Sequence, residues 1–244
     1  MIKINRTIFS PLVVGFGDLH VGSTSVDNKT LQDHLNFIQE QNINVILLGD
    51  LIENASKTSI GAGVYDQYLN PRDQIDAVVS LLTPIKHLIL GSVQGNHERR
   101  TYKTSGMDPG MIIADKLDIP YSDDRMLIWI TLNTQHYMIH SHHGERGGTT
   151  AGGVTNALMN EGNQHEGIDI YMRGHTHSSM AFTSPKWCFS QRGCESKKDI
   201  YFSVCPGYLQ YEGYASQKDY KMPSTKLYYF ELSPHSKKVN LLSH

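Results

Sequence analysis

The chain has 244 residues, 39% of them hydrophobic, which is enough for one domain with a substantial buried core. Its 22 Lys and Arg residues nearly balance 24 Asp and Glu residues, so the formal net charge of -2 provides no global positive field for a polyanion. No apolar run approaches the roughly 20 residues of a membrane span, and the apolar stretch at 12–16 is too short for a signal peptide. We therefore expect a soluble, cytoplasmic protein with no membrane partner.

Three cysteines are too few and too uneven in number for a disulfide framework, which favours a reducing compartment. Cys205 lies in an apolar run and is expected to be buried. A metal site at Cys188 and Cys194 is the less favoured interpretation, because it would need a further ligand. No repeat or linker divides the chain, so residues 1–244 are expected to form a single domain.

The first half of the chain alternates predicted strands and helices. The expected elements are a strand at 12–16, a helix through Leu31, Leu35 and Ile38, a strand at 45–48, a helix opening at Asn70-Pro71 and a strand at 88–90. Connections of this length imply parallel strands, with the helices covering the sheet.

The second half is richer in strands. Strand-like segments occur at 126–132, 135–141, 168–172, 200–204 and 226–232. Asn133-Thr134 separates the first two and indicates a hairpin. We expect an α/β protein in which some strands are antiparallel.

Side chains that bind metals follow the ends of several apolar runs. In chain order the motifs are GDLH with Asp18 and His20, GDLIEN with Asp50, GNHE with Asn96 and His97, HSHHG with His140, His142 and His143, and RGHTH with His175 and His177. Because the carboxyl ends of parallel strands converge on one crevice, these distant groups are expected to meet. Carboxylate, amide and imidazole donors suit divalent cations, and an aspartate can bridge two of them. The motifs contain no cysteine, so a structural thiolate zinc site describes them poorly.

In order and spacing these motifs resemble the calcineurin-like metallophosphoesterase superfamily, whose pattern is DxH, GD, GNH followed by D or E, a lone H, and GHxH. The similarity runs over residues 18–177 and implies a four-layer α/β/β/α sandwich with two mixed β-sheets. It also implies two divalent cations. One would be held by Asp18, His20, Asp50 and His177, and the other by Asp50, Asn96, His175 and the lone histidine, so that Asp50 bridges them.

The lone histidine has three candidates. We choose His143, because the family places this residue at a strand end directly before glycine, with His142 as the second choice and His140 as the third. The segment that begins at His143, HGERGG, also resembles a variant of phage-type members, which would place the protein in a bacterial cell or a phage-infected host. His97 resembles the family's histidine that is not a ligand and that stabilises the phosphoryl oxygens or protonates the leaving group.

Departures from the pattern narrow the expected activity. GDLIEN lacks the arginine that clamps phosphate in protein Ser/Thr phosphatases, and Glu53 stands where purple acid phosphatases have a metal-binding tyrosine. We expect a phosphoesterase that hydrolyses phosphodiester bonds, with a nuclease as one form, by attack of a hydroxide that bridges two cations. Mn²⁺ is the first choice, and Fe²⁺, Ni²⁺ and Zn²⁺ suit the same donors. The alternatives are a phosphomonoesterase acting on a nucleotide or phosphoprotein, and a non-catalytic scaffold.

Two further segments are candidate substrate contacts. Arg99, Arg100 and Lys103 directly follow GNHE and would hold substrate phosphates, nucleic acid among them, although a solvated basic turn explains them equally well. Four tyrosines after the 200–204 strand are slightly favoured for stacking on a substrate: Tyr208, Tyr211, Tyr214 and Tyr220. The sequence leaves the oligomeric state open.

Overall fold

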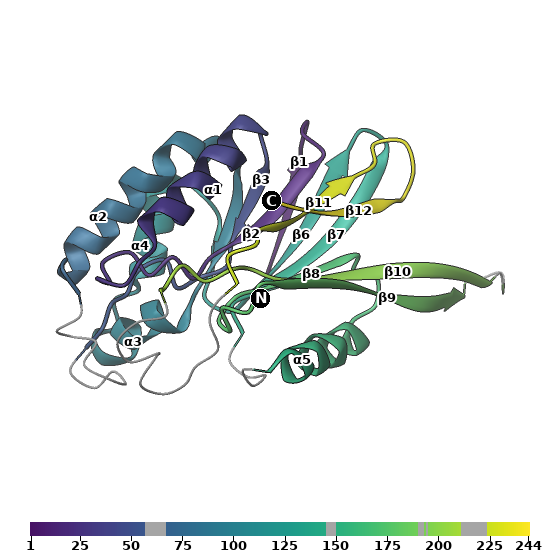
Figure 1. Ribbon diagram of the computed structural model, residues 1–244. Coiled ribbons are helices and arrows are strands. Elements are labelled where there is room, and N and C mark those ends of the chain that lie inside the picture. Colours follow the sequence, from purple (N-terminus) through teal and green to yellow (C-terminus); the bar gives the residue numbers. More distant parts are fainter. Residues whose placement is uncertain (57–66, 145–149, 190–192, 194, 211–223) are drawn as a thin grey trace.

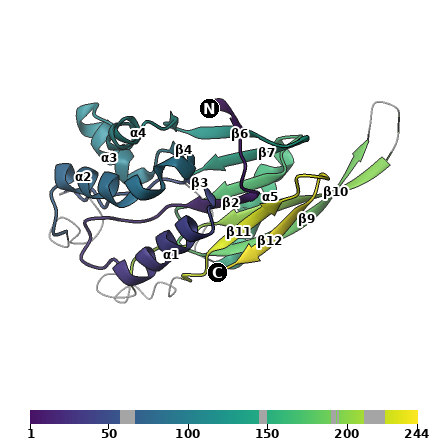
Figure 2. The ribbon, with the colours of Figure 1, turned by 90° about the horizontal axis from the view of Figure 1, so that it is seen from above.

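The computed structural model describes residues 1–56, 67–144, 150–189, 193, 195–210 and 224–244. Within them the chain forms two six-stranded sheets that lie face to face, with helices on both outer faces (Figures 1 and 2). Both sheets mix parallel and antiparallel pairs. The expected α/β fold with two mixed sheets is confirmed.

The first sheet carries the three strands that lead into the GDLH, GDLIEN and GNHE motifs. Its order is β12 (Val239–Ser243), β11 (Tyr228–Leu232), β2 (Leu12–Phe16), β3 (Asn44–Leu47), β4 (Ile89–Val93) and β5 (Tyr121–Ser122). The pairs from β2 through β5 are parallel, as expected, while β11 runs antiparallel to both of its neighbours. The carboxyl ends of β2, β3 and β4 therefore lie at the same edge.

Helices cover the outer face of this sheet. They are α1 (Asn28–Glu40), α2 (Pro71–Leu82), a 3₁₀ helix (Thr83–Leu88) and α4 (Pro109–Leu117). The Asn70 side chain accepts a hydrogen bond from the backbone N–H of Asp73 at 3.1 Å, and Pro71 occupies the first helical position. The predicted start of α2 is confirmed.

The second sheet carries the two histidine-rich motifs. Its order is β1 (Ile2–Thr7), β6 (Arg125–Leu132), β7 (Gln135–His142), β8 (Ile170–Arg173), β10 (Glu195–Val204) and β9 (Met180–Phe189). Leu132 pairs with Gln135, so Asn133 and Thr134 form the tip of the predicted hairpin. Helix α5 (Ala151–Gln164) covers the outer face of the second sheet. Helix α3 (Asn96–Ser105) begins inside the GNHE motif, which follows β4 of the first sheet.

Three apolar clusters fill the three interfaces between these four layers. One packs α1, α2 and α4 on the first sheet, a second fills the space between the sheets, and a third joins the second sheet to α5. Cys205 is buried in the cluster between the sheets, as predicted. No helix among the described residues is long and apolar enough to cross a membrane.

Candidate metal centre

The predicted ligands come from both sheets and gather at one edge of the sandwich. Asp18 and His20 follow β2, Asp50 follows β3 and Asn96 follows β4, all from the first sheet. From the second sheet, His143 directly follows β7, and His175 and His177 follow β8. Strand ends converge here as the parallel pairing requires, and the site therefore bridges the two sheets.

One group of donor atoms consists of Asp18, His20 and His177, whose nitrogen and oxygen atoms lie within 4.8 Å of one another. The Nε2 atoms of His20 and His177 are 3.1 Å apart, and His177 Nε2 is 3.8 Å from Asp18 Oδ1. Asp18 and His20 are almost completely buried. This is the set that the resemblance assigned to one cation, apart from Asp50.

A second group consists of Asp50, His143 and His175, also within 4.8 Å of one another. Asn96 joins it, because its Oδ1 atom lies 2.9 Å from His143 Nε2 and 2.7 Å from His175 Nδ1. His143 Nε2 is 3.2 Å from Asp50 Oδ2. These four residues match the set assigned to the other cation.

Asp50 belongs to more than one of these groups. Its donor atoms also lie within 4.8 Å of those of His20 and His97. Asp50 is therefore in contact range of both sets, which is the placement that a bridging carboxylate needs. His97 Nε2 is 3.8 Å from Asp50 Oδ2. This distance is compatible with His97 as a metal ligand and with His97 as a group that contacts the substrate.

The backbone around the site adopts conformations that L-residues rarely take. Five predicted ligands have φ between 49° and 75°: Asp18, His20, Asp50, His175 and His177. They are five of the nine non-glycine residues with positive φ in the described part of the chain. Each costs roughly 1 to 3 kcal/mol and persists only where the surrounding structure holds it, which is common at ligand sites.

Burial shifts the pKa values of the aspartates and histidines in the candidate centre. Burial raises the pKa of Asp18 to about 6 and lowers the pKa values of His97 and His175 to about 4. Burial also opposes a charge on His143, but Asp50 and Asp18 outweigh it and raise the pKa of this ring to about 9. A buried set of carboxylates, an amide oxygen and mostly neutral imidazoles fits divalent cations that accept mixed N and O ligands.

Several residues that the sequence analysis did not assign hold the ligands in place. Glu53 Oε2 lies 3.0 Å from His20 Nδ1, and the Leu48 carbonyl lies 2.7 Å from His143 Nδ1. The buried Cys205 thiol donates to Asp18 Oδ2 at 3.4 Å. Such partners fix the tautomer and orientation of a ligand. Glu53 was visible in GDLIEN, whereas nothing in the sequence linked Cys205 to Asp18.

The other two candidates for the lone histidine point elsewhere. His142 Nε2 is 2.7 Å from Glu161 Oε2 on α5, and His140 Nδ1 is 3.1 Å from Glu161 Oε1. Neither histidine belongs to a described group of three potential metal ligands. The choice of His143 stays a prediction, and this geometry favours it.

The structure does not bring the three predicted basic contacts into one cluster. Arg99 donates to Gln94 Oε1 at 3.0 Å, while the Arg100 guanidinium lies against the His97 ring, with nitrogen–nitrogen distances of 3.0 and 3.2 Å. Lys103 is exposed in the last turn of α3. Within the described part of the chain, only Arg100 of the three contacts a side chain of the candidate centre, His97, whereas Arg99 also donates to the Asp123 carbonyl.

The predicted substrate role of Tyr208 is wrong. Its side chain is buried in the cluster beneath α1, and its hydroxyl lies 2.8 Å from His34 Nδ1, so it is unavailable for stacking on a substrate. Tyr211, Tyr214 and Tyr220 lie outside the described residues, as does Cys194. Cys188 is half-buried in β9.

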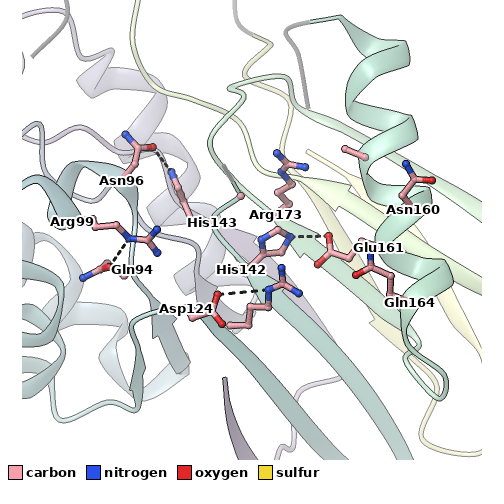
Figure 3. A pocket seen from close by; sticks show the side chains of 13 residues that line it. Gln94, Asn96, Arg99, Asp124, His142, His143, Asn160, Glu161, Gln164 and Arg173 are labelled. Carbon is pink, nitrogen blue, oxygen red and sulfur yellow. Dashed lines mark hydrogen bonds and ion pairs between the residues drawn. The ribbon is translucent and has the colours of Figure 1, made fainter. Parts of the chain in front are cut away.

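A polar cavity of about 500 Å³ adjoins the candidate metal centre (Figure 3). Asn96 and His143 belong both to its wall and to the second group of donors. Its remaining wall comes from α3, the start of β6, the ends of β7 and β8, α5, and the adjoining residues Gln94, Asp124 and Gly144. No sequence pattern predicted this cavity, because these elements meet only in the folded chain.

No protein-family model matches the chain, and no curated protein matches it. Solved structures with a similar arrangement include a predicted phosphoesterase from Streptococcus pneumoniae TIGR4, at 15% identity and TM-score 0.41, covering 95% of this chain and 88% of that one. Vps29 of Chaetomium thermophilum has 11% identity and TM-score 0.41, covering 97% of both chains. GAP50 of Plasmodium has 8% identity and TM-score 0.41, covering 96% and 87%. These likenesses are too weak to carry an argument about function.

Proposed function

We propose that this chain is a metallophosphoesterase that hydrolyses phosphodiester bonds with two divalent cations, Mn²⁺ being the first choice. One observation carries the proposal. Seven polar side chains from five separate motifs converge at one edge of the two sheets. Donor atoms of six of them approach one another to 2.7–3.2 Å, and Asp18 Oδ1 lies 3.8 Å from His177 Nε2. Five of them adopt a strained backbone conformation to do so.

The ligand sets follow from the two groups of donors. Asp18, His20, Asp50 and His177 would hold one cation, and Asp50, Asn96, His143 and His175 the other. Such cations neutralise phosphoryl oxygens and lower the pKa of coordinated water. The buried partners of these ligands then keep the imidazole tautomers and carboxylate orientations fixed during turnover.

His97 is positioned to act on the substrate. Its Nδ1 lies in hydrogen-bond contact with the Glu53 carbonyl, so Nδ1 carries the proton and donates it, and Nε2 presents a lone pair that lies 3.0 Å from an Arg100 nitrogen. To protonate a leaving oxygen, the ring must therefore first take up a second proton at Nε2. The Arg100 guanidinium against the ring adds a positive charge next to the phosphoryl position. We assign His97 the role of a group that acts on the leaving oxygen, supported by Arg100.

Two features favour a diester over a monoester. GDLIEN lacks the clamping arginine of the phosphatase motif. The cavity beside the metal centre also offers room for a second substituent on the phosphate, which a monoester does not have. These features support the phosphodiesterase assignment, with nucleic acid as one candidate substrate.

The proposal is tested with the full chain, stripped of metal and then loaded ion by ion. We expect two equivalents of Mn²⁺ per chain by elemental analysis and faster hydrolysis of bis-p-nitrophenyl phosphate than of p-nitrophenyl phosphate. Single-stranded DNA, duplex DNA and RNA extend the comparison. Failure to bind metal would support the scaffold alternative, and faster hydrolysis of the monoester would support a phosphomonoesterase.

His97→Ala separates the catalytic role from a ligand role. The variant should keep both metal equivalents and lose turnover, most severely on substrates with poor leaving groups, because these need protonation most. Loss of one metal equivalent would make His97 a ligand instead.

A further inference from the structure

Three guanidinium groups line the cavity beside the candidate metal centre. Arg99 comes from α3, Arg125 from the start of β6 and Arg173 from the end of β8, so three separate elements contribute one arginine each. Figure 3 labels Arg99 and Arg173. The amide side chains of Gln94 and Gln164 also belong to the wall. A wall of this kind suits a hydrophilic anion rather than an apolar ligand.

The two carboxylates in the wall already have partners of their own. Both oxygens of Glu161 face His140 and His142, at 3.1 and 2.7 Å. Asp124 lies 3.6 Å from Arg125 Nε and 3.8 Å from the N-terminal nitrogen, in a largely exposed position. Three guanidinium groups thus stand against two carboxylates, of which Asp124 is paired with Arg125 and Glu161 faces two imidazoles, so the wall carries a formal excess of positive charge.

Arg173 is built into the wall. Its side chain is buried, with 3% of the residue exposed, and it directly precedes Gly174 and His175 in the chain. Gly144, which follows His143, packs against the guanidinium so closely that an added Cβ would lie 2.2 Å from Arg173 Nε. Gly144 has a φ of +94°, a conformation that glycine adopts without strain. The residues next to two predicted metal ligands therefore also shape the cavity.

Resting on the proposed function, we propose that this cavity binds a second phosphate group of the substrate, separated from the scissile diester by a short polar linker. Guanidinium groups bind phosphate oxygens in bidentate fashion, and the neighbouring amides can bond to hydroxyl groups of the linker. The volume of about 500 Å³ lies within the usual range for ligand pockets, roughly 300–1,000 Å³. The cavity would supply the arginine contacts that GDLIEN lacks.

Two chromogenic substrates that differ only in the second phosphate test the proposal: thymidine 5′-(p-nitrophenyl phosphate), with and without a 3′-phosphate. We expect the 3′-phosphate to lower KM about tenfold or more, since one charge-assisted hydrogen bond contributes about 1.5–3 kcal/mol. Arg99→Gln and Arg125→Gln should each reduce this KM ratio towards one. Arg72→Gln, on the exposed face of α2, is the matched control and should keep the full ratio. Equal KM values for the two substrates in the parent protein would overturn the proposal.

Binding provides a readout that does not depend on turnover. Titration calorimetry of the full chain without added metal should detect thymidine 3′,5′-bisphosphate, with about tenfold weaker binding to Arg99→Gln. If the metal-loaded protein hydrolysed neither substrate while this arginine-dependent binding remained, the proposed function would fail and the second-phosphate site would stand. Identical binding by the parent protein and by both arginine variants would exclude the proposed second-phosphate site, even if the protein hydrolyses the substrates.

The second phosphate has two sources, a small bisphosphate or the adjacent phosphate of a nucleic-acid strand. Competition by single-stranded oligonucleotides of increasing length distinguishes them. For a strand, inhibition should strengthen beyond two phosphates and weaken steeply with salt. If the substrate is a small bisphosphate, inhibition should not increase further for oligonucleotides with more than two phosphates. A dependence on Arg99 and Arg125 is expected in both cases, and its absence in both would contradict the proposal.

Discussion

Glu98 Oε2 accepts a hydrogen bond from the backbone N–H of Asp50 at 3.1 Å, and its Oε1 accepts one from Leu51 at 2.8 Å. The same carboxylate also accepts from the N–H of Gly95 at 3.0 Å. A Cβ at Gly95 would lie 2.1 Å from Asp50 N, so only glycine permits this contact. The last residue of GNHE therefore fixes the turn that presents the predicted bridging carboxylate.

Glu98→Gln should destabilise the fold and weaken the metal centre. The amide leaves only one acceptor oxygen and turns its NH₂ group towards buried backbone donors, which costs about 2–4 kcal/mol. Thermal denaturation and Mn²⁺ titration measure the two effects. Glu40→Gln, at the exposed end of α1, is the matched control. Unchanged melting and metal affinity would show that Glu98 does not support the Asp50 turn.

Asp50→Asn tests the predicted bridge. Because Asp50 is assigned to both cations, its loss of charge should weaken both sites and reduce hydrolysis by several orders of magnitude. Elemental analysis and turnover at saturating Mn²⁺ check this, with the exposed Asp33→Asn on α1 as control. Full turnover of Asp50→Asn would exclude the bridging role.

Single alanine variants decide among the three clustered histidines. His143→Ala should lose one metal equivalent, because its Nε2 lies beside Asn96 Oδ1 and Asp50 Oδ2. His142→Ala should retain both metals with a smaller defect, and His140→Ala should have the smallest, because both rings contact Glu161 instead. An indirect partner typically costs about 10- to 100-fold in affinity or activity. The reverse order of defects in a metal titration would assign the ligand role to His140 or His142 instead of His143.

Gly207→Ala should displace a predicted ligand from outside every recognised motif. A Cβ at this position would lie 2.4 Å from His177 Cγ, so the imidazole must move. We expect metal affinity to fall about 10- to 100-fold with the fold retained. Gly152→Ala on α5 is the control, since its added Cβ meets nothing within 4 Å. Equal metal affinities of the two variants would show that the His177 ring tolerates the shift.

His34 should make stability depend on pH. Burial lowers its pKa to about 4, from an ordinary value of 6.5. Between these values the unfolded chain takes up a proton that the folded protein excludes, so the contribution of neutral His34 is complete above pH 6.5 and is lost as the pH falls towards 4. The melting temperature of the parent protein relative to His34→Gln should therefore decrease from pH 7 to pH 5. His235→Gln changes an exposed histidine, and its melting temperature should differ from that of the parent protein by the same amount at both pH values. A difference between the parent and His34→Gln that does not change with pH would refute the role assigned to His34.

Strong periodic patterns made several elements predictable from the sequence. The buried strands β2, β3 and β4 each contain a short apolar run, although β3 begins with Asn44 and β4 includes Gly91 and Ser92, and α2 begins with an asparagine cap and a proline. The sequence analysis did not identify β1 or α5. In β1 the residues alternate between half-buried and exposed at a sheet edge, and α5 contains three glycines and few large apolar residues. Their positions are set by tertiary packing, which overrides weak local preference.

The sequence was sufficient to name the chemical groups of the candidate centre, because each motif follows a strand whose carboxyl end must reach the same edge of a sheet. It could not show which of His140, His142 and His143 turns towards Asp50, since that depends on where α5 places Glu161. Nor could it show the cavity, whose arginines come from α3, β6 and β8. Local patterns determine residue types and strand ends, whereas distances between side chains far apart in the chain arise only when both sheets and their helices pack together.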